Sequence, residues 1–208
     1  MKATNMEYLI LLSCVSLVMA MAATAQRSAV LDTSGNPLRR GIEYYVKPAI
    51  TEAGGPFTLV SRNGSCPFYV GQRNVSVDGI PVTFAPFDEG DNVVRELKNF
   101  KVTFSAATIC VKSTAWKVGE TEPVSGRRLI ATGEGRYTNY FYIRKEQDCR
   151  SCYSIEWCPT ELCPICRFEC GSVGNLFENG QRLAALDDGS GSGRSLVFER
   201  ARDYESGK

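Results

Sequence analysis

The sequence has 208 residues and nearly balanced charge, with 24 lysines and arginines against 23 aspartates and glutamates and a formal net charge of +1. Such a balance creates no long-range field, so neither nucleic acid nor an anionic membrane is expected as a partner. The complete absence of histidine removes Ser-His-Asp and Cys-His catalysis, and the sequence therefore predicts a protein that is not an enzyme and needs no cofactor.

The chain begins with the layout of a secretory signal peptide. Lys2 precedes an apolar run over residues 8–23, and small residues follow at Ala23-Thr24-Ala25. A membrane anchor is the alternative, but a spanning helix needs about 20 apolar residues, and this run is shorter and contains two serines. We therefore expect a signal peptide over residues 1–25, one mature domain over residues 26–208, and secretion to the extracellular space or the vacuole.

After the signal, short apolar and aromatic runs recur between turn residues such as glycine, proline and asparagine. They lack the 3.6-residue periodicity of an amphipathic helix, so we interpret them as β-strands of an all-β barrel or sandwich. Tyr45, Phe104, Trp116 and Phe141 are expected in the core, and a polar tail from about residue 202 is expected to fray. The expected strands are 44–47, 57–60, 68–72, 82–84, 102–104, 109–112, 116–118, 129–131, 140–145, 153–157, 183–186 and 196–199.

Eight cysteines remain after removal of the signal, and six of them lie between Cys149 and Cys170. The Cys-x-x-Cys pairs at 149/152 and 163/166 have a spacing that can chelate zinc. An even cysteine count in a secreted chain favours disulfides instead, and we expect no metal. Eight cysteines can pair in many ways, so spacing alone leaves the connectivity open.

Two Asn-x-Ser sequons begin at Asn63 and Asn74. Sequons of this kind are glycosylated where they lie on exposed loops of secreted proteins. Both asparagines are therefore candidate glycosylation sites.

Several segments, in order along the chain, match one known family. They are Val30-Leu31-Asp32-Thr33-Ser34-Gly35-Asn36-Pro37-Leu38, Gly41-Ile42-Glu43-Tyr44-Tyr45-Val46, Cys158-Pro159-Thr160, Cys170-Gly171-Ser172-Val173-Gly174 and Arg182-Leu183-Ala184. With them the sequence closely resembles the plant Kunitz family, of the soybean trypsin inhibitor type. The cluster of closely spaced cysteines resembles the miraculin-like branch of that family.

The resemblance implies a β-trefoil with twelve strands in three pseudo-repeats. It also implies three disulfides, and it leaves two alternatives for Cys149 and Cys152. These two either pair with each other or leave a thiol that links two chains, so the alternatives are a monomer and a disulfide-linked dimer. The implied pairs are Cys66 with Cys110, Cys158 with Cys170, and Cys163 with Cys166.

By position, the resemblance places the inhibitory loop at Pro86, Phe87, Asp88, Glu89 and Gly90. The P1 residue, whose side chain fills the primary pocket of a peptidase, then falls near Asp88. Because the trypsin pocket ends in a carboxylate, an acidic P1 residue opposes trypsin binding. Phe87 suits an apolar pocket if the register shifts by one.

A pair of arginines and one unusual residue complete the candidate site. Arg127 and Arg128 form an alternative basic loop, for which an ordinary solvated loop is the simpler interpretation. Arg40 stands where inhibitory members of the family carry an asparagine that braces the loop from inside. The resemblance therefore implies a softer loop in this chain, and a loop that is less preorganised binds less well.

The predicted function is that of a secreted peptidase inhibitor in plant defence. The expected partner is a serine peptidase that is not trypsin, with a cysteine peptidase as the second class. The alternative is a trefoil that no longer inhibits and serves in binding or storage, which the residues Asp88 and Arg40 together permit.

Overall fold

In the computed structural model of the protein, the described residues are 27–50, 54–62, 64, 66–72, 79–147, 149, 151–187 and 193–201. Within them the chain forms twelve β-strands and one short 3-10 helix. The strands are β1 (Glu43–Pro48), β2 (Phe57–Ser61), β3 (Phe68–Gln72), β4 (Val82–Pro86), β5 (Phe100–Phe104), β6 (Trp116–Thr121), β7 (Arg128–Thr132), β8 (Tyr142–Lys145), β9 (Tyr153–Trp157), β10 (Gly171–Glu178), β11 (Gln181–Asp187) and β12 (Leu196–Arg200), and the helix is η2 (Pro159–Glu161).

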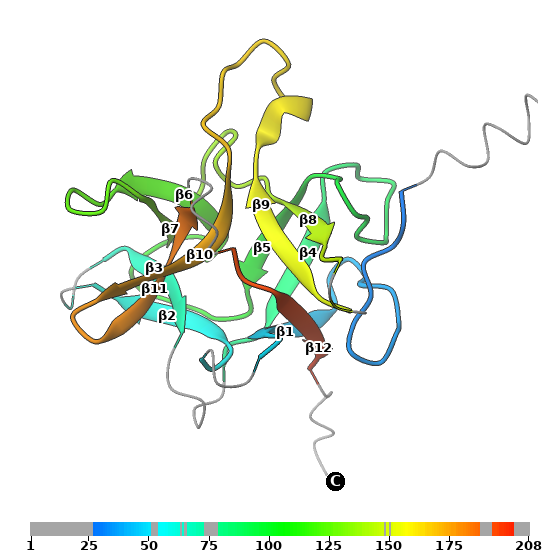
Figure 1. The fold of residues 1–208 in the computed structure, drawn as a ribbon, viewed down its shortest axis with the longest axis horizontal. Coiled ribbons are helices and arrows are strands. Elements are labelled where there is room, and N and C mark those ends of the chain that lie inside the picture. The colour runs from blue at the N-terminus through cyan, green and yellow to red at the C-terminus, as the bar shows by residue number, and fades with distance from the viewer. Residues whose placement is uncertain are drawn as a thin grey trace, which may run out of the picture.

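Six strands form a barrel (Figure 1). β1 pairs with β12 and with β4, β4 pairs with β5, and β9 pairs with β8 and with β12, all antiparallel. An isolated bridge between Phe100 and Phe141 joins β5 to the start of β8 and closes the ring. The barrel thus draws two strands from each third of the chain.

The other six strands form three hairpins, β2–β3, β6–β7 and β10–β11. One strand of each hairpin meets the other two, because β3 pairs with β7, β3 pairs with β11, and β7 pairs with β11. This triangle is the three-fold repeat of a β-trefoil, so the expected fold is confirmed. The turn of the third hairpin has positive φ at both Asn179 and Gly180, as a two-residue hairpin turn of type I′ requires.

Alternation of side chains between the two faces of each strand builds the core. Trp116 is fully buried, and its ring lies 5.5 Å from that of Phe104 and 6.4 Å from that of Phe141. The prediction that these three aromatics are in the core is confirmed. Tyr45 was wrongly placed there, since in β1 the neighbouring Tyr44 points inward and Tyr45 is half-buried.

Eleven of the twelve expected strands overlap a strand of the structure. The strand expected at 109–112 is wrong, because that segment is irregular and the Ile109 side chain is fully exposed. The structure adds β10, which sequence patterning missed because glycines and polar residues interrupt its apolar positions. β10 forms through its pairing with β11 over seven residue pairs.

Several expectations concern residues outside the described ones. These are the signal peptide over residues 1–25, the glycosylation sites Asn63 and Asn74, and the tail from residue 202. Among the described residues, no helix has the length and apolar character needed to cross a membrane.

Candidate functional site

The candidate site is the connection between β4 and β5, and we call residues 86–91 the β4–β5 loop. Pro86 pairs with Phe100 in the last rung of the hairpin, and the Phe87 N–H donates to the Asn99 carbonyl at 2.9 Å. The Phe87 side chain is 53% exposed, and its ring meets that of Tyr140 edge to face at 5.3 Å. Phe87 is thus tied to the sheet through its backbone while much of its ring faces solvent.

Arg40 braces this loop from inside. Its guanidinium Nη2 donates to the carbonyl oxygens of Pro86 and Asp88 at 3.0 and 2.8 Å, and its Nε donates to the Asp91 carbonyl at 3.1 Å. The expectation of an unbraced loop was therefore wrong. A longer, charged donor occupies the bracing position, and hydrogen bonds from a charged group are stronger than those from a neutral amide.

Asp88 is folded into a turn. Its carbonyl accepts from the Asp91 N–H at 3.1 Å in addition to Arg40, and its Oδ1 accepts from the Gly90 N–H at 3.0 Å. Among the described residues, nothing donates a hydrogen bond to the Phe87 carbonyl. The carbonyl at the expected P1 position is therefore already engaged within the loop, whereas the preceding one is not.

A cavity of about 430 Å³ lies against the β4–β5 loop, with Phe87, Asp88, Asn99 and Glu161 among its lining residues. Glu161 of η2 accepts from Lys98 Nζ at 2.7 Å and from Asn99 Nδ2 at 3.0 Å. These contacts bring the segment after β9 beside the β4–β5 loop, although the two are far apart in sequence.

Comparison with known proteins identifies the family of this fold and loop. A family model described as legume Kunitz trypsin and protease inhibitor matches residues 30–198. The chain belongs to the Kunitz inhibitor family. It is 45% identical over 204 residues to Kunitz type trypsin inhibitor 106 of Medicago truncatula, covering 94% of this chain and 97% of that protein.

Two further similar proteins are informative. Miraculin from Synsepalum dulcificum is 32% identical over 181 residues, covering 80% of this chain and 82% of that protein, in agreement with the miraculin-like resemblance. The rice bifunctional α-amylase/subtilisin inhibitor, a solved structure, is 29% identical and superimposes with a TM-score of 0.69. That match covers 85% of this chain and all of the rice chain.

The Kunitz fold of this chain carries four disulfides. They join Cys66 to Cys110, Cys158 to Cys170, Cys163 to Cys166, and Cys149 to Cys152. All eight described cysteines are thus bonded within the chain, and none offers a thiolate for zinc. The same pairing leaves no described thiol for a link to a second chain.

Arg127 and Arg128 are supports of the Kunitz scaffold and not an exposed basic loop. The Arg127 guanidinium donates to three backbone carbonyls, those of Asn175 at 2.8 Å, Leu186 at 3.0 Å and Ala185 at 3.3 Å. The Arg128 guanidinium lies 4.6 Å from the centre of the Trp157 ring. Sequence reasoning missed this role because the carbonyls that hold Arg127 are 48, 58 and 59 residues away in the chain.

Proposed function

We propose that this chain inhibits a serine peptidase with an apolar primary pocket, and that Phe87 is the P1 residue. The observation that carries the proposal is the Arg40 brace. One guanidinium nitrogen holds the carbonyls on both sides of Phe87, at Pro86 and Asp88, which fixes the backbone around an exposed aromatic side chain.

The geometry suits the way such inhibitors act. A loop held in place before binding loses little conformational entropy in the complex, which favours affinity. Burying a phenylalanine side chain in an apolar pocket contributes about 1.5–3 kcal/mol. The oxyanion hole of a serine peptidase needs a carbonyl that can still accept hydrogen bonds, and in this loop the Phe87 carbonyl meets that condition.

Trypsin is a poor candidate for the target. Asp88, Glu89 and Asp91 follow Phe87 closely in the chain, and the trypsin pocket itself ends in a carboxylate. Juxtaposed like charges cost several kcal/mol. The name of the Medicago relative refers to trypsin, whereas that of the rice protein refers to subtilisin. An apolar P1 residue agrees with a target like subtilisin.

Secretion and a monomeric state belong to this proposal. The apolar run after Lys2 and the four disulfides support passage through an oxidising compartment, with the extracellular space or the vacuole as destination. The pairing of Cys149 with Cys152 supports a monomer over a disulfide-linked dimer.

The first test is titration of the mature protein against subtilisin, chymotrypsin, trypsin and papain. We expect inhibition of the first two, and we expect Phe87→Ala to weaken it about 100-fold, as loss of a central aromatic contact does. Phe177→Ala is the matched control, because Phe177 is also an exposed phenylalanine, at 65%, but lies on the β10–β11 hairpin. Equal inhibition by wild type and Phe87→Ala would overturn the assignment of Phe87.

Two arginine variants determine whether Phe87 or Asp88 is the P1 residue. If Phe87 is P1, Phe87→Arg gains inhibition of trypsin and Asp88→Arg does not. The reverse result would place P1 at Asp88. Inhibition of papain alone would move the target to the cysteine class, and a wild-type protein that inhibits none of the four would favour the binding or storage alternative.

A further inference from the structure

A second loop projects from the same molecule. We call residues 158–170 the stapled loop, which leaves the barrel after β9, includes η2 and returns into β10 (Figure 1). Cys158 and Cys170 join its two ends, and Cys163 and Cys166 close its tip. The Cys166 N–H also donates to the Cys163 carbonyl at 3.0 Å, so the tip is a tight turn inside a covalent ring.

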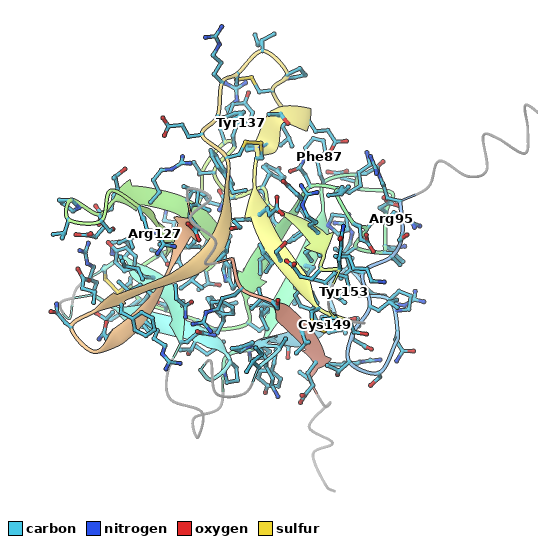
Figure 2. The ribbon with its side chains drawn as sticks, in the orientation of Figure 1. Phe87, Arg95, Arg127, Tyr137, Cys149 and Tyr153 are labelled. Atoms are coloured by element: carbon cyan, nitrogen blue, oxygen red, sulfur yellow. A yellow bond between two sulfur atoms is a disulfide. The ribbon has the colours of Figure 1, made fainter. Side chains whose placement is uncertain are left out.

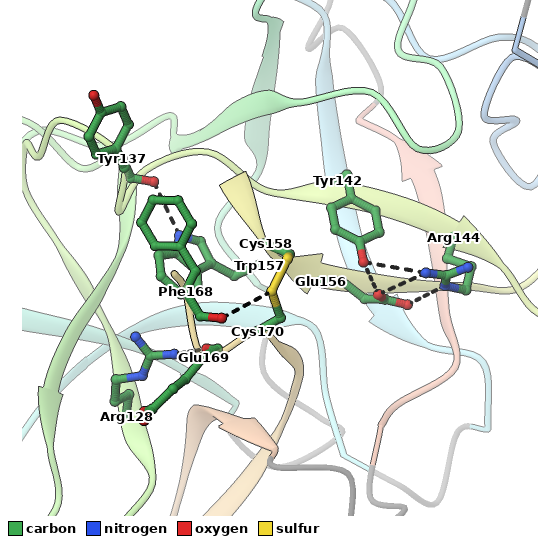
Figure 3. Close-up of a disulfide and its surroundings, with 10 residues drawn as sticks. All are labelled: Arg128, Tyr137, Tyr142, Arg144, Glu156, Trp157, Cys158, Phe168, Glu169 and Cys170. Atoms are coloured by element: carbon green, nitrogen blue, oxygen red, sulfur yellow. Dashed lines mark hydrogen bonds and ion pairs between the residues drawn. A yellow bond between two sulfur atoms is a disulfide. The ribbon is translucent and has the colours of Figure 1, made fainter. Parts of the chain in front are cut away.

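Aromatic contacts fix the base of the stapled loop (Figure 3). The Phe168 ring packs against the rings of Tyr137 and Trp157 at 5.9 and 5.4 Å, and Trp157 Nε1 donates to the Tyr137 carbonyl at 3.2 Å. Arg128 stacks on Trp157 and donates to the Glu169 carbonyl. Covalent bonds and packing together hold the loop in one position.

The tip of the stapled loop exposes an aliphatic side chain. Ile165 is 94% exposed and lies between Pro164 and Cys166. A single exposed apolar residue is ordinary on a protein surface, but this one is held on a cross-linked turn, so its burial by a partner orders little additional chain. A tight turn is not the extended backbone that a peptidase cleaves, so Ile165 is suited to a shallow apolar pocket and not to a catalytic cleft.

The stapled loop lies beside the β4–β5 loop. The Glu161 carboxylate accepts hydrogen bonds from the side chains of Lys98 and Asn99. The backbone carbonyl of Asn99 in turn accepts the N–H of Phe87. Glu161 and Phe87 also line the same cavity, and Figure 2 shows Phe87 and Tyr137 near the base of the projecting segment. The two loops therefore form adjacent parts of one surface.

A stable protein–protein interface needs more surface than the β4–β5 loop alone can supply. Such interfaces cover about 800 Å² on each partner and involve roughly 20–30 residues a side. Residues 86–91 supply only a small part of that number. A peptidase seated on Phe87 must therefore also cover the neighbouring surface, and the cross-linked segment with an exposed apolar tip is part of that surface.

We propose that the stapled loop is a second contact with the same target peptidase. Ile165 binds an apolar depression beside the active-site cleft of that peptidase, and this contact raises affinity and discriminates among peptidases with similar primary pockets. The proposal rests on the proposed function, because the partner is the peptidase that Phe87 engages.

The test compares Ile165→Ser with Val124→Ser. Val124 is the matched control, since it is also an aliphatic residue at the tip of a turn and 95% exposed, but it lies between β6 and β7. With subtilisin and chymotrypsin as probes, we expect Ile165→Ser to raise the inhibition constant about tenfold for at least one of them, mainly through faster dissociation. Val124→Ser is expected to stay within about twofold of wild type.

The outcomes separate the two proposals. If wild type inhibits either probe and Ile165→Ser inhibits it equally well, the second contact is overturned and the proposed function stands. An equal loss in Val124→Ser also overturns the second contact, because the effect is then not specific to the stapled loop. If wild type inhibits neither probe, the proposed function fails, and the second contact, which depends on it, fails with it. Both substituted residues are exposed, so unchanged melting temperatures are expected.

Discussion

The β4–β5 loop and the stapled loop are neighbours, but different forces hold them. The β4–β5 loop contains no cysteine, and the guanidinium of Arg40 binds three of its carbonyls. The stapled loop is held by two disulfides and by the packing of Phe168. One brace is thus a single side chain, which one substitution can remove, and the other is covalent.

This difference has a consequence for specificity. The three hydrogen bonds from Arg40 to the loop all go to backbone carbonyls and not to side chains. Residues 87–90 can therefore change in chemical character while the support stays the same. The covalent brace, in contrast, requires cysteines at four fixed positions within the stapled loop itself.

Removing the base disulfide is expected to have the largest effect. The change is Cys158→Ser with Cys170→Ser, which opens a loop with a sequence separation of 12. The chain-entropy model gives a loss of about 3 kcal/mol in the free energy of unfolding, and the melting temperature falls by on the order of 10 °C. Calorimetry measures both. The pair Cys163→Ser with Cys166→Ser, separated by 3, should lose less, and an unchanged melting temperature in the first variant would contradict the prediction.

Removing the guanidinium brace tests the other loop. We expect Arg40→Ala to raise the inhibition constant about 30-fold, equivalent to about 2 kcal/mol, because three carbonyls lose a charged donor. Mass spectrometry should also show cleavage after Phe87. Arg40→Asn, which keeps a shorter, neutral donor at this position, is expected to recover part of the affinity.

The neighbouring arginine provides a control for that experiment. Arg39 is exposed, and its substitution by alanine removes the same charge without touching the loop. Arg39→Ala should inhibit like wild type. An effect equal to that of Arg40→Ala would show that charge near the loop, and not the brace, is responsible.

A smaller effect is expected where the two loops meet. Glu161→Ala removes the ion pair with Lys98 and the amide contact to Asn99. Because the Lys98 and Glu161 side chains are about half exposed, their ion pair contributes little, and we expect a rise in inhibition constant of about threefold. A rise as large as that of Arg40→Ala would mean that the β4–β5 loop depends on the stapled loop for its shape.

The β6–β7 turn is held by a third kind of brace, a carboxylate. The Glu122 carboxylate accepts the N–H groups of Val124 and Ser125 at 3.0 and 2.6 Å, and these hydrogen bonds lower the pKa of Glu122. Because the folded pKa is depressed, the stabilising contribution is present above the ordinary glutamate pKa of about 4.3 and is lost as pH falls through the lower folded value.

The corresponding measurement is chemical unfolding as a function of pH. Wild type should be more stable than Glu122→Gln near neutrality, and the difference should shrink as the solution is acidified below the ordinary glutamate range. Neither a guanidinium nor a disulfide titrates there, so the other two braces should persist. A difference that is independent of pH would contradict this prediction.

Local sequence patterns identified most of the scaffold, because aromatic and β-branched runs between turn residues mark strands wherever one face is buried. They failed at residues 109–112, where Ile109 is apolar but fully exposed. They also missed β10, whose strand structure depends on pairing with β11 and not on its own apolar pattern. The second error arises because tertiary pairing outweighs local composition.

The site was less accessible to sequence reasoning than the scaffold. Family position placed P1 near Asp88, with Phe87 as the alternative if the register shifts by one, and the hydrogen bonds that engage the Asp88 carbonyl come partly from Arg40, 48 residues earlier. No local pattern reports which carbonyls a distant guanidinium reaches. The same holds for Arg127, whose partners on β10 and β11 are set by the hairpin triangle.

The order in which the barrel strands pair also constrains how the chain reaches its folded state. β1 pairs with β12 along five residue pairs, from Tyr44 with Arg200 to Pro48 with Leu196. The ring therefore cannot close until nearly the whole chain has left the ribosome. High contact order of this kind slows folding to milliseconds or longer, and until closure the edges of β1 and β9 that pair with β12 stay open to other chains. A truncation that removes β12 would therefore leave the barrel with a permanent unpaired edge, which is a site for aggregation.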